Sequence, residues 1–393
     1  MGFASALPIL RVMSRASAFA FFVALLPSMA DAEIPAGCGT PMAMEDGWSV
    51  SEPQAQQLDP ALICSIEGEL EKHKDANPHS VIVVRNGVIV YEKYFSGPDL
   101  RWPQQHWGEP LQDAPHDART KHDIQSITKS VVSLLVGVAL DRGLIKNVDA
   151  PLLSFFPEYA DLASPERERI TLRDLLTMQA GLDWPIRPYL SMARKVDAAP
   201  DPYRLVLQQP MVADPGQKWR YNNGIAELVG GVVQKATGRR LDEFAKDVLL
   251  EPLGITDWEW GQMASGNPGA SWGLRLRPRD LAKIGQLILD QGSWHGRQIV
   301  TADWIKEMTL PRIVTPKFSY AYLWWLNQSS MDGRSIEWIK GSGWGGQCLN
   351  IIPKLALVVV VTAGVYDFEG KGPQNLACDT VMDRSVLRAA SGR

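Results

Sequence analysis

The sequence predicts an α+β fold: an antiparallel β-sheet built from N- and C-terminal segments, flanked by helices, with an inserted all-α lobe. Two observations lead to this prediction. β-branched runs typical of strands lie near both ends of the chain, and the middle shows the apolar periodicity of helices. We expect one unit over residues 33–393, with an α/β part at about 33–135 and 270–393 and a helical lobe at about 136–269.

The strand predictions come from two pairs of β-branched runs. The stretch SVIVVRNGVIVYEKYF (80–95) predicts a hairpin, because Asn86-Gly87 between its two runs is a strong turn signal. Near the C-terminus, QCLNIIP (347–353) is followed by LALVVVVTAGVY (355–366). We therefore expect strands from both ends of the chain to share one sheet.

The helical middle is predicted from five stretches with helical patterns. The first, SVVSLLVGVALDRG, is apolar nearly all round and is expected to be buried. Thr171 is a candidate N-cap for the second, and glycines stand at or near the expected ends of the others. The five stretches are 130–143, 171–181, 224–238, 241–254 and 277–292.

The N-terminal segment has the layout of a secretory signal peptide. Two arginines precede the apolar stretch 16–26, and an Ala-Asp-Ala cleavage pattern ends at Ala32. We expect residues 1–32 to be removed near Ala32 and the protein to be periplasmic or secreted. The alternative is an uncleaved membrane anchor. No later segment has the apolar length of a membrane span, so no stable span is expected.

Four cysteines remain after this segment: Cys38, Cys64, Cys348 and Cys378. An even number in an exported protein permits two disulfides in three possible connectivities. We favour the pairs nearest in sequence, Cys38–Cys64 and Cys348–Cys378. The alternative is four buried free thiols, since Cys is among the most buried residue types.

Composition and missing motifs exclude several classes of function. The chain has 393 residues, a net charge of -4 and no Lys/Arg block, so nucleic acid is not an expected partner. It has no H-E-x-x-H sequence, and its six histidines show no metal-ligand spacing, so we expect no metal and no cofactor. It also has no G-x-S-x-G elbow, which argues against an α/β-hydrolase. These patterns leave the oligomeric state open.

The sequence DIQSITKS places Ser126 and Lys129 three residues apart at the start of the first apolar helix. Such residues share a helix face, and a helix N-terminus offers free N–H groups and a positive dipole end to an oxyanion. A desolvated lysine there can take up or share the proton of the serine. The alternative is an ordinary helix start. The preceding stretch Gly97–Thr120 is expected to be a long loop that crosses toward Ser126.

A second motif, WRYNNG, contains Tyr221 and Asn223. A phenol near an ammonium group can be held as phenolate, or can relay a proton between nucleophile and leaving group. A neighbouring asparagine can orient the lysine without adding charge. The alternative is a turn that closes on Gly224, with the tyrosine packed in the core.

A third motif, KGSGWGGQ (340–347), precedes a predicted strand. It contains G-x-G-x-x-G, but a dinucleotide-binding loop follows a strand and opens a helix, whereas here a strand follows. Glycines beside an edge strand let a ligand approach the backbone closely, which suits an N–H donor aimed at a carbonyl oxygen. His122, four residues before Ser126, is either an acid–base group or a loop histidine.

Together, Ser126-x-x-Lys129, Tyr221-x-Asn223 and the glycine-rich run resemble the serine β-lactamase and penicillin-recognising superfamily. The resemblance is closest to its class C-like branch, which includes esterases, D-amino acid peptidases and 6-aminohexanoate-dimer hydrolases. A tyrosine motif stands where class A enzymes have Ser-Asp-Asn. The resemblance extends from about residue 80 to 366 and implies a β-lactamase/transpeptidase-like fold.

The resemblance implies a role for each matching side chain. Ser126 is the acylated nucleophile, and Lys129 is its proton partner. Tyr221 is the general base for acylation and the acid for the leaving group. Asn223 positions Lys129.

The glycine-rich run is implied to supply backbone groups. The N–H groups of Ser126 and Trp344 form the oxyanion hole, which agrees with the donor positions at a helix N-terminus and a glycine-flanked strand. Substrate binding is expected at Ser342, Gly343 and Gly345.

One position departs from the family pattern. The third motif of the superfamily is Lys-Thr-Gly or His-x-Gly, and with Gly343 as its glycine, Gly341 takes the place of the lysine. Lys340 stands one residue early, so on a strand its side chain points to the opposite face. In the family that lysine helps to bind the carboxylate of a β-lactam, so β-lactams are not the expected substrates.

The predicted function is an exported serine hydrolase that cleaves a small amide or ester through an acyl-serine intermediate. Its expected partner is that small-molecule substrate. The alternatives are a β-lactamase or D-Ala-type peptidase, and a catalytically silent penicillin-binding-type protein that binds envelope components.

Overall fold

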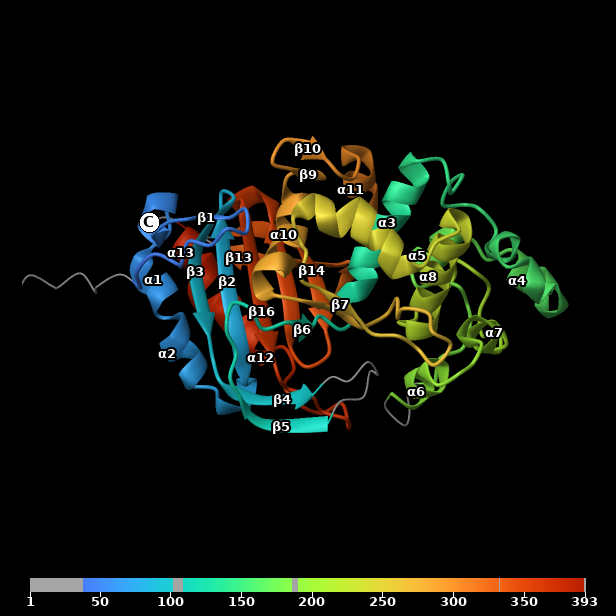
Figure 1. Ribbon diagram of the computed structural model, residues 1–393, viewed down its shortest axis with the longest axis horizontal. Helices are drawn as coiled ribbons and strands as arrows, with labels where there is room; N and C mark the ends of the chain where they lie inside the picture. The colour runs from blue at the N-terminus through green and yellow to red at the C-terminus, as the bar shows by residue number, and fades with distance from the viewer. Residues whose placement is uncertain (1–37, 102–108, 186–189, 332, 392–393) are drawn as a thin grey trace, which may run out of the picture. The chain divides into compact units, whose positions relative to one another are not determined.

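A nine-stranded sheet is the largest sheet of the computed structural model (Figure 1). Its neighbouring strands pair antiparallel, except for the short parallel pair β1 and β3. In spatial order the strands are β1 (Ser49–Val50), β3 (Val88–Tyr94), β2 (Pro78–Arg85), β16 (Leu357–Ala363), β15 (Gln347–Ile352), β14 (Arg334–Gly343), β13 (Trp325–Met331), β12 (Ser319–Tyr320) and β11 (Ile313–Val314). The N-terminal hairpin thus lies beside the C-terminal strands, as the sequence predicts.

The structure describes residues 38–101, 109–185, 190–331 and 333–391. The chain divides into two units, Met1–Ala36 and Gly37–Arg393, and only the second is described. The expected signal peptide at residues 1–32 therefore lies outside the described residues. Within those ranges, no helix has both the length and the apolar character needed to cross a membrane.

Three small sheets and a set of helices complete the described unit. The small sheets are β4 (Gly97–Arg101) with β5 (Glu109–Ala114); β6 (His122–Asp123), β8 (Leu274–Leu276) and β7 (Glu259–Trp260); and β9 (Ser293–Trp294) with β10 (Arg297–Gln298). The α-helices are α1 (Pro60–Cys64), α2 (Ile66–Glu71), α3 (Ile127–Asp141), α4 (Pro165–Glu168), α5 (Leu172–Leu176), α6 (Ser191–Asp197), α7 (Pro202–Leu207), α8 (Asn223–Thr237), α9 (Leu241–Ala245), α10 (Pro278–Leu289), α11 (Ala302–Met308), α12 (Leu376–Thr380) and α13 (Leu387–Ala390). The short 3-10 and π segments are η1 (Pro53–Gln56), η2 (Lys74–Ala76), η3 (Leu152–Phe155), η4 (Pro157–Leu162), η5 (Lys246–Leu250), η6 (Glu251–Leu253), η7 (Pro353–Leu355) and η8 (Val381–Val386).

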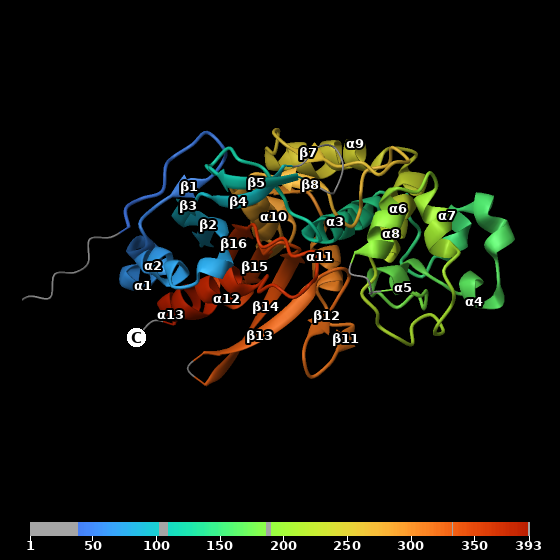
Figure 2. The ribbon, with the colours of Figure 1, turned by 90° about the horizontal axis from the view of Figure 1, so that it is seen from below.

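Helices cover both faces of the sheet (Figures 1 and 2). Successive side chains of a strand point to opposite faces. In β2, Val81 and Val83 join an apolar core with α1, α2, α12 and η8, whereas Ile82 and Val84 join a second core with α3 and α10. Strands buried on both faces are nearly continuous in β-branched residues, which explains the runs that predicted them.

The predicted hairpin and helices are largely confirmed. Asn86 and Gly87 have φ values of 52° and 75°, as a tight two-residue hairpin turn requires. All residues of α3 from Ile127 to Ala139 are buried, in agreement with its apolar composition. Gly238 closes α8 with a φ of 66°. The segment 142–258 between α3 and β7 supplies helices α4 to α9 of the inserted helical lobe.

Two local predictions are wrong. The expected loop Gly97–Thr120 contains the paired strands β4 and β5, whose Pro- and Asp-rich sequence lacks the alternation that marks a half-buried strand. The helix expected over 171–181 ends at Leu176, because Met178 adopts a left-handed φ of 59° that breaks the helix. Its predicted start is right, since Thr171 and Asp174 form a capping box.

Both expected disulfides are confirmed. Cys38 bonds to Cys64 on α1, and Cys348 on β15 bonds to Cys378 on α12. The described residues contain no free cysteine. The second disulfide therefore fastens a C-terminal helix to the strand that follows the glycine-rich run.

Candidate active site

Ser126 lies where the chain turns sharply from β6 into α3. The preceding residue, Gln125, has a left-handed φ of 51°, which non-glycine residues rarely adopt. Asp123 holds this turn, because its Oδ1 accepts hydrogen bonds from the backbone N–H groups of Gln125 (2.7 Å) and Gly273 (3.3 Å). The Ser126 side chain makes no capping hydrogen bond to α3, so Ser126 is not an ordinary helix-capping serine.

The Ser126 hydroxyl is instead bonded to Lys129. The Nζ atom of Lys129 donates to Ser126 Oγ over 2.8 Å and to the backbone carbonyl of Ser271 over 2.9 Å. Lys129 is only 1% exposed. A buried ammonium group needs such partners, because desolvation penalises the charge. Two fixed acceptors therefore aim the lysine at the serine.

A buried glutamate positions the loop that carries Ser271. The two carboxylate oxygens of Glu227, on α8, accept hydrogen bonds from the N–H groups of Ala270 (2.7 Å) and Ser271 (2.9 Å). Burial raises the pKa of Glu227, while these hydrogen bonds and the charge of Lys129 oppose that rise. Sequence reasoning missed Glu227, although an acidic residue in the apolar stretch GIAELVGGVV is a signal of a buried partner.

A second carboxyl group lies near Lys129. Burial raises the pKa of Asp197 well above its usual value, and the negative charge of Glu227 raises it further. Asp197 Oδ1 accepts a hydrogen bond from Trp272 Nε1 over 3.0 Å. Asp197 Oδ2 is buried and has no hydrogen-bond partner among the described residues. The lysine thus has two acidic groups behind it, one of them strongly disfavoured as an anion.

Tyr221 lies beside the lysine. The Nζ atom of Lys129 is 5.0 Å from the centroid of the Tyr221 ring, a distance at which the ring attracts a cation. The ring stacks on Trp325 of β13, with centroids 5.8 Å apart and planes 24° apart. The structure therefore brings Ser126 and Tyr221 into the lining of one pocket, and Lys129 lies in contact with both of them.

The two asparagines that follow have different positions. Asn222 caps α8, because its Oδ1 accepts a hydrogen bond from the N–H of Ile225 over 3.1 Å. Asn223 lines the same pocket as Ser126, and its buried Oδ1 has no hydrogen-bond partner in the described part of the chain. The predicted role of Asn223 in positioning Lys129 stays a prediction.

Two glycines let β14 approach the nucleophile's turn. A Cβ atom on Gly341 would lie 3.0 Å from Ile127, and one on Gly343 would lie 2.4 Å from the carbonyl oxygen of Ile124. A larger residue at Gly343 would therefore collide with the backbone that leads to the nucleophile. This close packing places Trp344, the next residue, in the pocket with Ser126. The oxyanion-hole assignment to the Ser126 and Trp344 N–H groups remains a prediction.

Ser342 and Gly345, which are also expected to bind substrate, lie against other groups. Ser342 pairs with Cys348, so its side chain lies on the sheet face that α12 covers. Gly345 pairs with Val365, and a Cβ atom on Gly345 would lie 2.3 Å from the Tyr366 ring. None of the three residues expected to bind substrate, Ser342, Gly343 and Gly345, is among the described residues that line the pocket.

Lys340 lies away from the pocket. Its Nζ is 3.9 Å from Asp379 Oδ1 on α12, the helix on the opposite face of the sheet from α3. Burial lowers the pKa of Lys340, and the charge of Asp379 partly opposes this. The structure thus agrees with the strand-register argument that this lysine cannot replace the superfamily lysine.

The pocket at Ser126 is small, with a volume of about 210 Å³. Most of its described lining is apolar or aromatic and comes from the helical lobe and its connections. No local pattern in the sequence marks these residues, because they converge only in the fold. The lining residues are Gln125, Ser126, Trp184, Pro185, Leu190, Met192, Ala193, Tyr221, Asn223, Ser271, Trp272 and Trp344.

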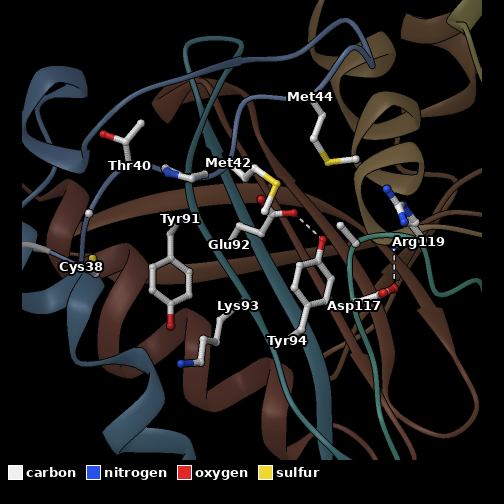
Figure 3. Close-up of a pocket in the computed structure, with 13 residues that line it drawn as sticks. Cys38, Thr40, Met42, Met44, Tyr91, Glu92, Lys93, Tyr94, Asp117 and Arg119 are labelled. Atoms are coloured by element: carbon white, nitrogen blue, oxygen red, sulfur yellow. Dashed lines mark hydrogen bonds between the residues drawn. The ribbon is translucent and has the colours of Figure 1, made fainter.

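Two larger hollows lie elsewhere. One of about 510 Å³ lies over β3 (Figure 3), where Glu92 accepts a hydrogen bond from Tyr94 and forms an ion pair with the buried Arg279. Another of about 680 Å³ lies beside β11 to β14. As far as the described residues go, only the pocket at Ser126 contains a hydroxyl bonded to a lysine. Chemistry, rather than size, therefore identifies the candidate site.

A sequence model of the family described as Beta-lactamase matches residues 68–372. The chain belongs to the beta-lactamase family. The match includes the Ser126, Tyr221 and Trp344 segments, so the family prediction made from these motifs is confirmed.

Two curated relatives of this beta-lactamase family member have names that describe acyl transfer or ester cleavage. Monacolin J acid methylbutanoyltransferase from Aspergillus terreus is 29% identical over 199 residues, which are 46% of this chain and 47% of that protein. Esterase EstB from Burkholderia gladioli is 27% identical over 188 residues, 45% of each chain. The chain thus spans about half the length of the curated relatives it matches.

Solved structures with the same fold include three kinds of protein. A 6-aminohexanoate-dimer hydrolase-like protein from Bacillus anthracis has a TM-score of 0.64 and 21% identity over 80% of both chains. A family VIII carboxylesterase has a TM-score of 0.61 and 20% identity, covering 80% of this chain and 94% of that one. A penicillin-binding protein homologue from Pyrococcus abyssi has a TM-score of 0.61 and 20% identity, covering 83% and 77%. At these identities the likeness shows the fold.

Proposed function

We propose that this beta-lactamase family member is an exported serine hydrolase that cleaves a small ester or amide through an acyl-serine intermediate. The observation that carries the proposal is the 2.8 Å hydrogen bond from the buried Lys129 Nζ to Oγ of Ser126, a residue that lines a pocket together with Tyr221. A serine activated by an adjacent basic group is the arrangement that nucleophilic catalysis requires.

In the acylation step, Ser126 Oγ forms a bond to the carbonyl carbon of the substrate. Tyr221, as the general base, takes the hydroxyl proton, while Lys129 stabilises the charge that develops on Oγ. The carbonyl π electrons move to oxygen, and the N–H groups of Ser126 and Trp344 donate to that oxyanion. The bond to the alcohol or amine then breaks, the leaving group takes the proton from Tyr221, and the acyl-serine remains.

In the deacylation step, water attacks the carbonyl carbon of the acyl-serine and gives a proton to Tyr221. The same N–H groups hold the second oxyanion. The bond between that carbon and Ser126 Oγ then breaks, and Oγ recovers the proton from Tyr221. The products are a carboxylic acid and the original enzyme, so no co-reactant other than water is needed.

The pocket favours a small, uncharged acyl group. Its volume is about 210 Å³, and none of its described lining residues is a lysine or arginine. A β-lactam carries a carboxylate that needs a cation, but Lys340 lies beside Asp379 on the other side of the sheet. The names of the esterase and methylbutanoyltransferase relatives support acyl chemistry of this kind.

We also propose that residues 1–32 direct export and that the mature unit begins at about residue 33. The two disulfides support this proposal, because disulfides form and persist in oxidising compartments.

A substrate panel tests the proposed activity. The purified protein and its Ser126→Ala variant are compared on p-nitrophenyl esters of short acids, 6-aminohexanoate dimers and nitrocefin. We expect the wild-type protein to turn over an ester or the dimer, with little turnover of nitrocefin. The variant should turn over neither the ester nor the dimer. Fast Ser126-dependent nitrocefin turnover would favour the β-lactamase alternative. Binding without turnover on the whole panel would favour the catalytically silent alternative.

A further inference from the structure

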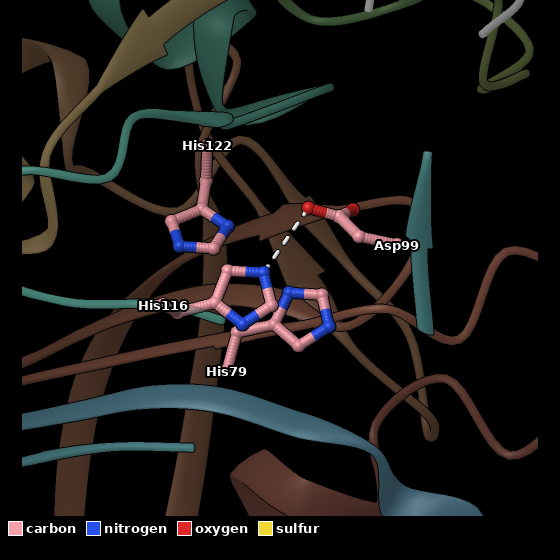
Figure 4. A group of neighbouring side chains, drawn as sticks. All are labelled: His79, Asp99, His116 and His122. Atoms are coloured by element: carbon pink, nitrogen blue, oxygen red, sulfur yellow. Dashed lines mark hydrogen bonds and ion pairs between the residues drawn. The ribbon is translucent and has the colours of Figure 1, made fainter. Parts of the chain in front are cut away.

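Three histidines and an aspartate, far apart in the sequence, meet beside the segment that leads to Ser126 (Figure 4). His79 comes from β2, Asp99 from β4, His116 from just after β5, and His122 from β6. One ligand atom from each residue lies within 4.8 Å of the others. Figure 4 shows the three rings and the carboxylate grouped around one point. The proposed hydrolysis uses none of these side chains.

Backbone carbonyls fix the orientation of two of the rings. The Nε2 atom of His79 lies 3.0 Å from the carbonyl oxygen of Pro98, and the Nδ1 atom of His116 lies 2.8 Å from that of Phe95. A carbonyl oxygen only accepts, so each of these nitrogens carries a proton. The opposite nitrogen of each neutral ring then presents a lone pair. Metal-binding histidines typically donate their second N–H to a backbone carbonyl in this way.

The remaining ring nitrogens lack ordinary hydrogen-bond donors. His79 Nδ1 and His122 Nε2 are buried and have no partner among the described residues. His116 Nε2 faces Asp99 Oδ2 at 3.2 Å. A neutral ring with its proton on Nδ1 would leave two acceptors face to face, so either a proton on Nε2 or a bound cation lies between them. Buried polar atoms without a partner are costly, and one cation would satisfy these nitrogens when His122 carries its proton on Nδ1.

The packing around His79 also preserves this arrangement. A Cβ atom on Gly364 would lie 2.5 Å from His79 Nε2 and 2.3 Å from the Pro98 carbonyl oxygen. Only glycine therefore leaves room for that hydrogen bond. The rings of His79 and His116 stack with centroids 3.8 Å apart, and His122 lies 5.3 Å and 5.1 Å from them.

We propose that His79, Asp99, His116 and His122 bind one divalent transition-metal ion, with Zn²⁺ as the best match. Three imidazole nitrogens and one carboxylate oxygen form a tetrahedral zinc set with bonds of about 2.0–2.2 Å. Such bonds place the ligand atoms about 3.4 Å apart, so on binding these atoms converge by up to about 1.4 Å. The nearly parallel rings of His79 and His116 also rotate so that both lone pairs point at the ion. Four protein ligands leave no open position, which makes the ion structural rather than catalytic.

The ion would fasten the paired strands β4 and β5 to β2 and to β6. His122 is four residues before Ser126, and the strained Gln125 lies between them. A metal bound at His122 would therefore hold the start of the turn that presents the nucleophile. The sequence shows no metal motif because the four ligands come from four separate elements, so the expectation of no metal is the one that this proposal reverses.

Metal content tests the proposal directly. The full chain is purified without a polyhistidine tag, stripped with a chelator, and returned to Zn²⁺ or to Co²⁺. We expect about one ion per chain, visible bands of tetrahedral Co²⁺, and a Tm that Zn²⁺ raises by about 5 °C. Less than about a tenth of an equivalent of retained metal, with no Co²⁺ bands, would overturn the proposal and leave a His116–Asp99 ion pair only.

Matched variants assign the ion to this cluster. Asp99→Asn and His116→Gln are expected to lower metal affinity at least about 100-fold, whereas His295→Gln, at an exposed histidine outside the cluster, should bind as the wild type does. Equal binding by all three variants would place the metal elsewhere and contradict the proposal. If one cluster variant fails to fold, the other cluster variant still tests where the ion binds. The Tm rise of the wild-type protein with Zn²⁺ still shows whether an ion binds.

The proposal is separable from the proposed hydrolysis. Ser126→Ala should lose turnover and keep the metal. Retention of metal by an inactive wild-type protein would support the metal site while contradicting the hydrolase assignment, and an active protein that never holds metal would do the reverse.

Discussion

The Nζ atom of Lys129 lies 2.8 Å from Ser126 Oγ, one helical turn along α3, and is held on its other side by the carbonyl oxygen of Ser271. The Ser271 N–H is in turn bonded to the Glu227 carboxylate over 2.9 Å. A chain of contacts thus runs from a buried acid on α8 to the hydroxyl on α3. Each of these side chains can be replaced separately, and we expect a different result from each replacement.

Replacing the lysine should abolish activation of the serine. We expect Lys129→Met to lower kcat/KM by about 10²–10⁴-fold, since that is the usual contribution of a positioned proton-transfer group. Folding should survive, because the variant also removes a buried charge. The matched control is Lys340→Met, at a buried lysine on the other side of the sheet. Rates of ester hydrolysis and Tm values measured on both variants test this prediction. Similar losses of activity in the two variants would contradict the account.

Removing one oxygen from Tyr221 should separate chemistry from packing. Tyr221→Phe keeps the ring that stacks on Trp325 and removes the proton-transferring hydroxyl. We expect kcat to fall about 10²–10³-fold with little change in KM or Tm. Tyr91→Phe, in the hollow over β3, is the matched control and should leave kcat unchanged. A normal kcat for Tyr221→Phe would exclude this residue as the base.

Neutralising Glu227 should loosen the support of Lys129. Glu227→Gln leaves one oxygen for two N–H donors and turns an NH₂ group toward the other, which should cost about 1–3 kcal/mol of unfolding free energy. Because the Ser271 carbonyl then shifts, kcat should also fall, by roughly 10-fold. Denaturant unfolding and steady-state kinetics measure the two effects. Glu243→Gln, at an exposed acid on α9, should show neither.

The stability of the protein should depend on pH through Asp197. Burial raises its folded-state pKa well above 3.8, so the folded protein keeps a proton that the unfolded chain releases. Stability from this group is therefore present at low pH and is lost as pH rises from about 4. Asp197→Asn cannot ionise, so the Tm of this variant minus the Tm of the wild type should increase between about pH 4 and pH 7. A Tm difference that is flat or shrinks over this range would contradict the raised pKa.

Sequence reasoning reached the parts of the site that are local in the chain. Ser126 and Lys129 lie on one helical turn, so their contact follows from periodicity alone. The register of β14 likewise predicts that Lys340 faces away from Gly341. Tyr221 could be joined to Ser126 only through the family resemblance, because its approach depends on packing between α3 and the loop before α8.

The parts that sequence reasoning missed depend on contacts between distant segments. Glu227 acts through the backbone of Ala270 and Ser271, about 43 residues further along the chain. The walls of the pocket, such as Trp184 and Met192, come from short helices and turns of the lobe whose positions no local pattern fixes. The paired strands β4 and β5 lie in a stretch that the sequence predicts as a loop, so the histidine cluster that they complete was also not predicted.

The most direct test of the central claim is to find where a fluorophosphonate reacts. Intact mass and peptide mapping of the treated protein should show one adduct, on the peptide that contains Ser126. Ser126→Ala should show none, should keep its Tm, and should lose at least ~10³-fold in turnover. An adduct on another residue, or near-normal turnover by Ser126→Ala, would contradict the account.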